Sequence, residues 1–487
     1  MRAALSGMIF VFAGLFIVSA AVAQQAEQLP TGQTLTPLAA PGARFEPLTA
    51  HVGPNPAYRA DGAAAIAMRP DGQELLVLTS GFNRYVGAND KVVPAQSGQY
   101  IFRYAIGANG SRWVQTLMVP NSYSGIDWLP DGHGFIVGGG VDDVVHVFRR
   151  LGAGYAETGK PITLGHRAGV GADVKPQAAG VAVSPDGTRA LVANYYNDSV
   201  SLVDLRGGRV IAEQDLRPGK INPAQSGVAG GENPFAILWR DATHAWVSAP
   251  RDRQIVALAI TSTALRVTAR IATIGEPTAL LADPGAGRLY ATEDNADRLA
   301  MIDISSGGMI AEPRLGLPAS FGEMPKSKGV NANSLALLPD RRLLVTMGGI
   351  NALAIVEPGP TSAAVAGLVP TGWYPSAVAA SRDGRRVFVV NRKSPPGPNP
   401  IGCVPRLAVQ RSQPDACGKA NQYIFQLEKA GLLDFPLPAP KALVATTLQV
   451  ARNIGLDAAP ARAAAEAKLA ALRAHIKHVV FIVKENR

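Results

Sequence analysis

One short turn recurs along the chain, with an apolar stretch before it and another after it. Its clearest copies are Arg69-Pro70-Asp71-Gly72, Leu129-Pro130-Asp131-Gly132 and Ser184-Pro185-Asp186-Gly187. Proline fixes φ and glycine accepts positive φ, so each copy predicts a reversal between two strands. The turn aspartates, weaker copies included, fall at 71, 131, 186, 241, 283, 340 and 383. Seven copies at blade-sized intervals predict an all-β fold, a seven-bladed β-propeller over residues 45–436.

The composition agrees with a turn-rich, folded chain. The 487 residues include 51 Gly and 37 Pro, a clear excess over the average share of about 12 % for these two types together. A hydrophobic fraction of 47 % is too high for a disordered chain, and no Gly-X-Y period indicates collagen. The stretches before the turns consist of small residues, as expected for innermost strands that crowd round a narrow channel.

Two blades are predicted to carry a long insertion after their second strand. The insertion at 85–98 ends at Gln99-Tyr100-Ile101-Phe102, and the one at 394–420 is followed by Gln422-Tyr423-Ile424-Phe425. We therefore expect each insertion to lead into the third strand of its blade. Cys403 and Cys417, the only cysteines, lie in the second insertion. In an oxidising compartment we expect them to form a disulfide that staples this loop.

Strand direction assigns the loops to two faces. If the first strands run down, the Pro-Asp-Gly turns lie on the lower face. The loops that lead into the first strands, and those between the second and third strands, share the upper face. Loops on a rigid scaffold are where binding residues concentrate. We therefore expect a cation or polar ligand at the upper channel mouth, with candidate contacts Glu232, Asn233, Glu276, Glu293, Asn295, Trp373 and Tyr374. Capping of the blade turns explains any single member of this set equally well.

The charge balance favours anionic partners. Lys and Arg number 47 against 37 Asp and Glu, which gives a net charge of +10. Arg392 and Lys393, beside the second insertion, are candidates to steer anions. A generally basic surface explains the same balance, and no run of Lys or Arg suggests a nucleic-acid partner. We expect a monomer that takes a small-molecule or anionic cell-envelope ligand, or a protein partner.

Common catalytic motifs are missing from the sequence. It contains no Gly-x-Ser-x-Gly elbow, P-loop or His-Glu-x-x-His motif. His475 and His478 are three residues apart but have no partners at metal-ligand spacing. We expect no cofactor for the propeller itself.

The N-terminus has the features of a secretory signal peptide. Arg2 precedes an apolar stretch at 8–20, and Ala21-Val22-Ala23 supplies a small-x-small cleavage site. Cleavage after residue 23 would leave an extended segment at 24–44 and no transmembrane anchor. The mature chain is therefore predicted to be periplasmic or secreted.

After the propeller the sequence changes character. Residues 437–474 are predicted to be a Pro-rich and helical connector, with the helix at 461–474. Residues 475–487 are apolar at first and end in Lys484-Glu485-Asn486-Arg487. This stretch predicts a buried strand, which cannot be a domain by itself.

Together these features resemble a bacterial architecture in which a YVTN-repeat, YncE-like propeller is fused to a phosphoesterase of the alkaline phosphatase superfamily. The similar segments are 193–200, 371–375, 397–400, 426–432 and, above all, 476–487. The resemblance implies metal-dependent hydrolysis of phosphate esters, with Glu485 as a metal ligand and Asn486 as a metal or phosphate contact. The family's nucleophile and remaining ligands would lie beyond Arg487. We therefore expect a truncated second domain without a complete catalytic set, in which Glu485 and Asn486 equally suit a frayed terminus.

Three functions follow from these observations. The first is a non-catalytic module that binds or positions a ligand for a hydrolase that would follow it. The second is a lactonase-like propeller that hydrolyses its substrate with a cation at the channel mouth. The third is a protein-interaction scaffold without enzymatic activity.

Overall fold

The structure is a computed structural model that describes residues 26–52, 56–84, 92–221, 230–321, 324, 329–396, 428–456 and 459–482. The predicted signal peptide, Cys403 and Cys417, the Gln422-Tyr423-Ile424-Phe425 segment, and Glu485 and Asn486 lie outside the described residues. The expectations placed on them stay predictions.

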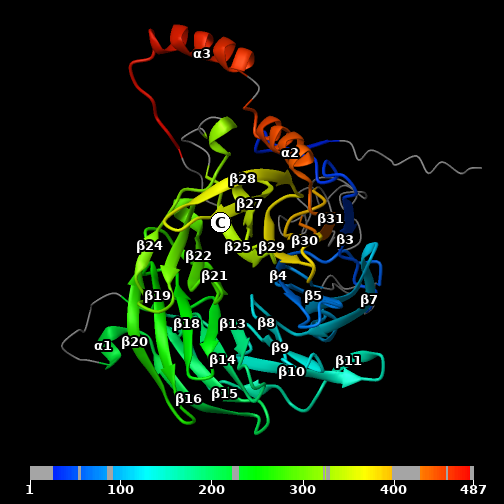
Figure 1. Ribbon diagram of the computed structural model, residues 1–487, viewed down its shortest axis with the longest axis vertical. Helices are drawn as coiled ribbons and strands as arrows, with labels where there is room; N and C mark the ends of the chain where they lie inside the picture. Colours follow the sequence, from blue (N-terminus) through cyan, green and yellow to red (C-terminus); the bar gives the residue numbers. More distant parts are fainter. Residues whose placement is uncertain are drawn as a thin grey trace, which may run out of the picture.

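Seven antiparallel sheets stand around a central axis, which confirms the predicted seven-bladed β-propeller (Figure 1). The sheets follow one another along the chain as meanders. Blade 1 comprises β4 (Ala63–Met68), β5 (Glu74–Thr79), β6 (Gln99–Gly107) and β7 (Gly110–Val119). Blade 2 comprises β8 (Ile126–Trp128), β9 (Gly134–Gly138), β10 (Val144–Leu151), β11 (Gly154–Glu157) and β12 (Ile162–Thr163). Blade 3 comprises β13 (Ala178–Val183), β14 (Arg189–Asn194), β15 (Ser199–Asp204) and β16 (Arg209–Asp215). Blade 4 comprises β17 (Ile237–Asp241), β18 (His244–Ala249), β19 (Gln254–Ile260) and β20 (Leu265–Ala272). Blade 5 comprises β21 (Pro277–Asp283), β22 (Arg288–Glu293), β23 (Arg298–Asp303) and β24 (Met309–Ala311). Blade 6 comprises β25 (Ala332–Leu337), β26 (Leu343–Met347), β27 (Ala352–Pro358) and β28 (Ala363–Pro370).

Blade 7 combines both ends of the propeller sequence. It comprises β29 (Pro375–Ala380), β30 (Arg386–Asn391), β31 (Gly431–Pro436) and the N-terminal β3 (Arg44–Pro47). Outside the ring lie the β1 (Glu27–Gln28) and β2 (Thr34–Leu35) hairpin and the helices α1 (Pro218–Ile221), α2 (Pro440–Asn453) and α3 (Ala459–Arg473). Short 3₁₀ turns lie in the loops between strands of the ring: η1 (Pro94–Gln96), η3 (Asp294–Ala296), η4 (Ala319–Phe321) and η5 (Gly348–Ile350). In blade 1 the third strand begins at Gln99, as the sequence predicts.

The recurrent turns join the first and second strands in all seven blades. In each of them the aspartate carboxylate accepts a backbone N–H from two or three residues further along the chain. The donors are the N–H groups of Gln73, His133, Thr188, Thr243, Ala286, Arg342 and Arg385, at 2.8–3.2 Å. Gly72 and Gly187 have φ of 76° and 73°, which a side chain would strain. The repeat is therefore a repeated hydrogen-bonded turn.

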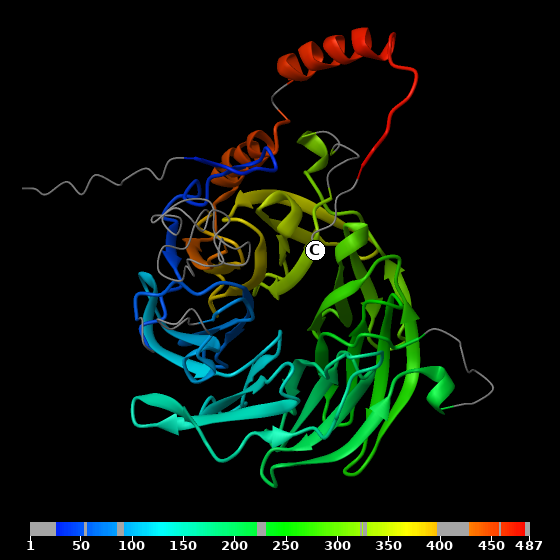
Figure 2. The ribbon, with the colours of Figure 1, turned by 180° about the vertical axis from the view of Figure 1, so that it is seen from behind.

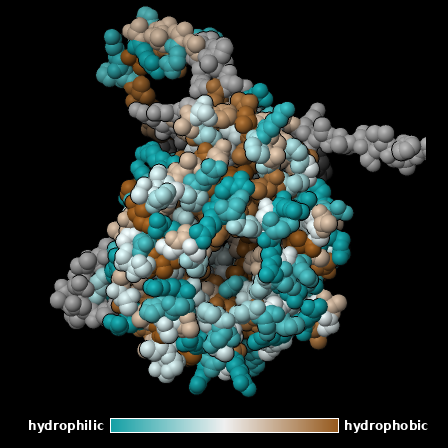
Figure 3. All heavy atoms as spheres, in the orientation of Figure 1, coloured by the Kyte–Doolittle hydropathy of each residue, from teal (hydrophilic) through white to brown (hydrophobic). Residues whose placement is uncertain are grey.

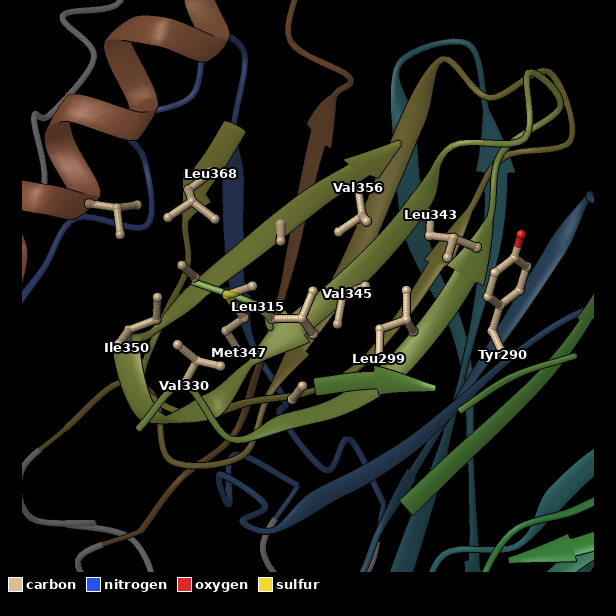
Figure 4. Close-up of a cluster of buried hydrophobic side chains, with 14 of the residues drawn as sticks. Tyr290, Leu299, Leu315, Val330, Leu343, Val345, Met347, Ile350, Val356 and Leu368 are labelled. Atoms are coloured by element: carbon tan, nitrogen blue, oxygen red, sulfur yellow. The ribbon is translucent and has the colours of Figure 1, made fainter. Parts of the chain in front are cut away.

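The hydrophobic core lies between blades. Among the described residues, buried apolar side chains form seven clusters, one for each pair of neighbouring blades. Figure 4 shows the cluster between blades 5 and 6, where Tyr290 and Leu299 of blade 5 meet Val345 and Met347 of blade 6. Each blade buries both of its faces, which explains the near-continuous apolar character of its second strand.

The ring closes through β3, which pairs antiparallel with β31 at the outer edge of blade 7. The carboxylate of Asp434 accepts hydrogen bonds from Arg44 at 2.6 Å, from Arg386 at 2.6 Å and from the backbone N–H of Ser111 at 2.7 Å. Asp434 is 2 % exposed. One buried carboxylate therefore connects the N-terminal strand, the second strand of blade 7 and the outer strand of blade 1.

We expect Asp434→Asn to lower the free energy of unfolding by about 3 kcal/mol, because it leaves two guanidinium groups beside an uncharged buried partner. The matched control is Asp383→Asn in an exposed turn, where we expect a change within about 0.5 kcal/mol. Urea denaturation followed by circular dichroism measures both. Equal midpoints for the two variants would show that closure does not depend on this carboxylate.

A second polar link joins blades 2 and 3. His166 lies between two carboxylates, with Nδ1 at 2.7 Å from Asp143 and Nε2 at 2.9 Å from Glu213. These two hydrogen bonds raise the pKa of His166 from 6.5 to about 9. The imidazolium therefore donates to both carboxylates across neutral pH and connects the two blades.

This raised pKa gives the link a defined pH dependence. Its stabilisation is complete below pH 6.5 and disappears as the pH rises through about 9. We expect the melting temperatures of the parent chain and His166→Gln to differ most near pH 6 and to converge by pH 10. After solvent screening, the pH-dependent part should be on the order of 1–2 kcal/mol. His133→Gln, on an exposed turn, is the control; a gap that stays constant with pH would contradict the link.

Helix α2 and the N-terminal segment cover blade 6. Helix α2 packs on the outer strand β28, where the Thr447 hydroxyl accepts the backbone N–H of Leu368 at 2.8 Å. Asn453 of α2 donates to Thr36 of the N-terminal segment at 2.8 Å. Pro440, which the sequence assigned to a Pro-rich linker, is the first residue of α2, a position where its missing N–H costs nothing.

Beyond α2 the chain leaves the propeller. Figures 1 and 2 show α3 standing away from the ring. The predicted strand at 476–482 is in no sheet, and Val479 to Ile482 are 77–87 % exposed. Residues 476–482 are therefore neither paired nor buried in this structure, and the assignment of 475–487 to the first strand of a further domain stays a prediction. In the described part of the chain, no helix has the length and apolarity needed to cross a bilayer.

Candidate functional site: the channel mouth

The first strands of all seven blades enclose one cavity on the axis, of about 500 Å³. Figure 3 shows predominantly hydrophilic side chains on the face seen in Figure 1. The strand residues that line the cavity include Ala64, Ile126, Val181, Ile237, Ala279, Leu335 and Ala377. The lining strands combine small side chains with larger aliphatic ones, so the prediction of small residues in the first strands holds only in part.

Polar bonds tie the first strands to one another around the cavity. The indole N–H of Trp128 donates to Ala67 in blade 1, and that of Trp239 donates to Ala182 in blade 3, both at 3.0 Å. The Ser376 hydroxyl donates to Ala63 at 2.7 Å and so joins blade 7 to blade 1. These three bonds join three of the seven pairs of neighbouring blades.

Glycine is needed where two blades approach most closely. The N–H of Gly180 donates to the carbonyl of Phe235 at 3.0 Å, and a Cβ at Gly180 would lie 2.1 Å from that oxygen. Any side chain at Gly180 would push Phe235 away from blade 3. This contact fixes Phe235 at the rim of the cavity.

An aromatic wall occupies the side of the mouth formed by blades 2 to 4. We define it as Tyr123, Tyr195 and Phe235. The ring of Tyr123 lies 5.6 Å from that of Tyr195 and 5.8 Å from that of Phe235, both edge to face. Tyr123 and Phe235 line the cavity directly. The wall offers a firm apolar surface to a ligand.

A polar wall occupies the opposite side, formed by blades 5 to 7 and blade 1. We define it as Asp294, Asn333, Tyr374, Arg392 and Ser80, all of which line the cavity. Arg392 Nη2 donates to the Ser80 carbonyl at 3.1 Å, and Asn333 donates to the Pro375 carbonyl at 3.1 Å. Tyr374 adopts φ 55°, and its N–H donates to Asn351 at 2.9 Å, which fixes this residue at the mouth.

The charged residues of the polar wall shift the pKa values of the tyrosines at the mouth. Burial raises the pKa of Tyr374; Asp294 raises it further, whereas Arg392 opposes the shift. Burial raises the pKa of Tyr123 to about 12, and Arg392 again opposes the shift. Arg392 therefore acts electrostatically on both sides of the mouth. Burial raises the pKa of Asp294 as well, and Glu276 adds to the effect.

Two buried polar atoms of the cavity wall lack a partner within the described part of the chain. They are Ser124 Oγ, next to the aromatic wall, and Asp294 Oδ1 in the polar wall. Buried polar atoms are rarely left unpaired in folded proteins, because each costs about 1–3 kcal/mol. Such atoms on both sides of one cavity are what a site for a hydroxylated or charged ligand requires.

Of the candidates from the sequence, Tyr374 and Arg392 line the cavity. Trp373 and Lys393 lie beside them. The Lys393 ammonium is 5.7 Å from the centre of the Trp373 ring and 3.3 Å from the Glu428 carboxylate. Lys393 is therefore paired on the rim, whereas Arg392 faces the cavity.

The other five candidates have partners of their own on the upper rim. Glu232 pairs with Arg251 at 3.1 Å, and the Asn233 N–H donates to Asp198 at 3.0 Å. Glu276 and Asn295 exchange two hydrogen bonds. These four cap the blade loops, which was the alternative explanation for their pattern.

Glu293 ends the second strand of its blade and is fully buried. It pairs with Pro277 in the same register in which Asn194 and Asn391 end their strands. Its carboxylate accepts the Gly275 N–H at 2.6 Å. Burial raises the pKa of Glu293, and the neighbouring Glu312 raises it further. Glu293 therefore occupies a structural position of the blade.

Sequence reasoning missed Tyr123, Ser124, Phe235, Asp294 and Asn333. A usable signal was present, since an aromatic residue stands just before or at the start of three first strands, at Tyr123, Phe235 and Tyr374. Asp294 lies between two residues that were chosen, but only the turn η3 decides that it faces the cavity.

The described residues contain no group of three His, Cys, Asp or Glu side chains placed to hold a metal ion. The carboxylates of Glu232, Glu276 and Glu293 are spread around the rim and do not converge. The described part of the mouth therefore does not fit the channel-mouth cation that a lactonase-like mechanism would need.

No known protein family and no curated protein matches the chain. Solved structures resemble it at low identity. U3-55K is 11 % identical with a TM-score of 0.53, over 82 % of this chain and 99 % of that one. The WD40 repeats of RRP9 are 10 % identical with a TM-score of 0.53, over 82 % and 98 %. A periplasmic gluconolactonase of Pseudomonas aeruginosa, PpgL, is 16 % identical with a TM-score of 0.45, over 65 % and 92 %. By fold, the chain is a seven-bladed β-propeller.

Proposed function

We propose that the chain is an exported binding module that holds a small, polar, anionic ligand at the upper mouth of its channel. Arg392 carries the proposal. Its guanidinium faces the cavity, and its side-chain partner within the described residues is a backbone carbonyl. A guanidinium with donors to spare in a concave site is well suited to a carboxylate or a phosphate.

The surroundings of Arg392 leave its charge effective. Asp61 is an acidic residue that interacts electrostatically with Arg392. Burial raises the pKa of Asp61 to about 8. The raised pKa favours the protonated carboxyl at pH 7, and in that form Asp61 leaves the charge of the guanidinium in place. The net charge of +10 adds a general attraction for anions.

We expect Arg392→Gln to weaken anion binding about tenfold or more, since it removes the one charged donor of the polar wall. The probes are citrate, inorganic phosphate and glucuronate, each titrated by calorimetry into the full chain at pH 7. Arg251→Gln is the matched control, because Arg251 lies on the same rim, is exposed and pairs with Glu232. Binding of none of the probes, or equal binding in both variants, would overturn the proposal.

Export rests on the signal-peptide features of residues 1–23. We expect the chain recovered from a bacterial periplasm to begin at Gln24, as measured by intact-mass spectrometry. A chain retained in the cytoplasm with Met1 or its neighbours in place would contradict export.

The role beside a hydrolase is the finer part of the proposal. It rests on the resemblance of residues 476–487 to the first strand of a phosphoesterase domain, and on the exposure of Val479 to Ile482, which would suit a strand that pairs with further chain. The interaction scaffold and the lactonase-like hydrolase stay as alternatives, and for the latter the described mouth lacks converging ligands.

A further inference from the structure

The two walls of the mouth differ in chemistry. The aromatic wall offers the rings of Tyr123 and Phe235, whereas the polar wall offers a guanidinium, a carboxyl and an amide. A ligand that fills the space between them needs an apolar face on one side and charged and hydrogen-bonding groups on the other. Simple inorganic anions lack the first, and apolar molecules lack the second.

The polar wall offers hydrogen-bonding groups that a simple anion would leave unused. Asp294 has a buried oxygen, Oδ1, that finds no partner among the residues the structure describes, and Tyr374 lies within reach of the charges of both Asp294 and Arg392. A carboxylate accepts hydrogen bonds, so its natural partner on a ligand is a hydroxyl group. On the other side of the cavity the Ser124 hydroxyl, which has no partner in the described part of the chain, can both donate and accept a hydrogen bond.

From this combination we infer that the ligand is an acidic saccharide, a hydroxylated ring that bears one carboxylate or phosphate. Its acid group pairs with Arg392, its hydroxyl groups bond to Asp294 and Asn333, and one face of the ring packs on Tyr123 and Phe235. This inference rests on the proposed function and specifies its ligand class. A cavity of about 500 Å³ accommodates one or two such rings.

The assignment separates the contributions of the two walls. Arg392 should determine how much more tightly acidic sugars bind than neutral ones, because it is the cationic side chain among the described residues that line the cavity. The aromatic wall should contribute alike to both, because both present the same ring face. A role of these residues in folding alone would not produce this division.

The test is calorimetry with the full chain at pH 7, using glucuronate, glucose 6-phosphate, glucose and phenylalanine as separate probes. We expect glucuronate or glucose 6-phosphate to bind at least about tenfold more tightly than glucose, which corresponds to one charge-assisted pair. The sugar acid that binds more tightly identifies the group as carboxylate or phosphate. Arg392→Gln should reduce the acidic-to-neutral ratio to within about threefold while glucose binding is retained.

Tyr123→Leu should weaken the acidic sugar and glucose by a similar factor of about three to ten. Tyr196→Leu, which touches Tyr195 from outside the cavity, is its control. Unchanged melting temperatures show that the variants remain folded. Arg392-dependent binding of phenylalanine, or of phosphate or citrate, without binding of any sugar would overturn the saccharide and keep the binding module. Binding of no probe at all would overturn both.

Discussion

The ring closes where β3 pairs with β31, and one buried carboxylate, that of Asp434, reinforces this seam. Asp434 bonds to two arginines and to a backbone N–H of the next blade, so it spans the seam where the two ends of the propeller sequence meet. All seven first strands contribute to the cavity, and each is fixed by the blades on either side. The shape of the mouth is therefore a property of the closed ring and of no single blade.

The two different walls of the site arise because the upper loops of the blades differ in sequence. The seven turns on the lower face are nearly alike, because each serves only to reverse the chain. On the upper face the blades differ: blades 2 to 4 supply the aromatic wall, and blades 5 to 7 and blade 1 supply Asp294, Asn333, Tyr374, Arg392 and Ser80. A repeated frame with unlike loops lets one side of a small cavity be apolar while the other carries charge.

The blades could be predicted from sequence because their signal is local. The turn aspartate recurs in all seven copies and, with proline and glycine in the clearest ones, marks both flanking strands. The strand β3 could not be predicted in this way, since its partner β31 is distant and the four residues 44–47 carry no pattern of their own. Arg392 and Tyr374 were found from their place in the upper loops. Ser124 and Asp294 were not, because only the assembled ring shows which polar atoms remain unpaired.

The pairing of Arg44 with Asp434 spans 390 residues. Closing so long a loop costs entropy, so we expect this pairing to form after the local hairpins of the blades. Until then β31 presents an unpaired edge, the kind of surface on which chains aggregate. A chain that crosses a membrane unfolded would meet this interval after transport, so the yield of the folded protein should depend on how soon its first and last strands meet.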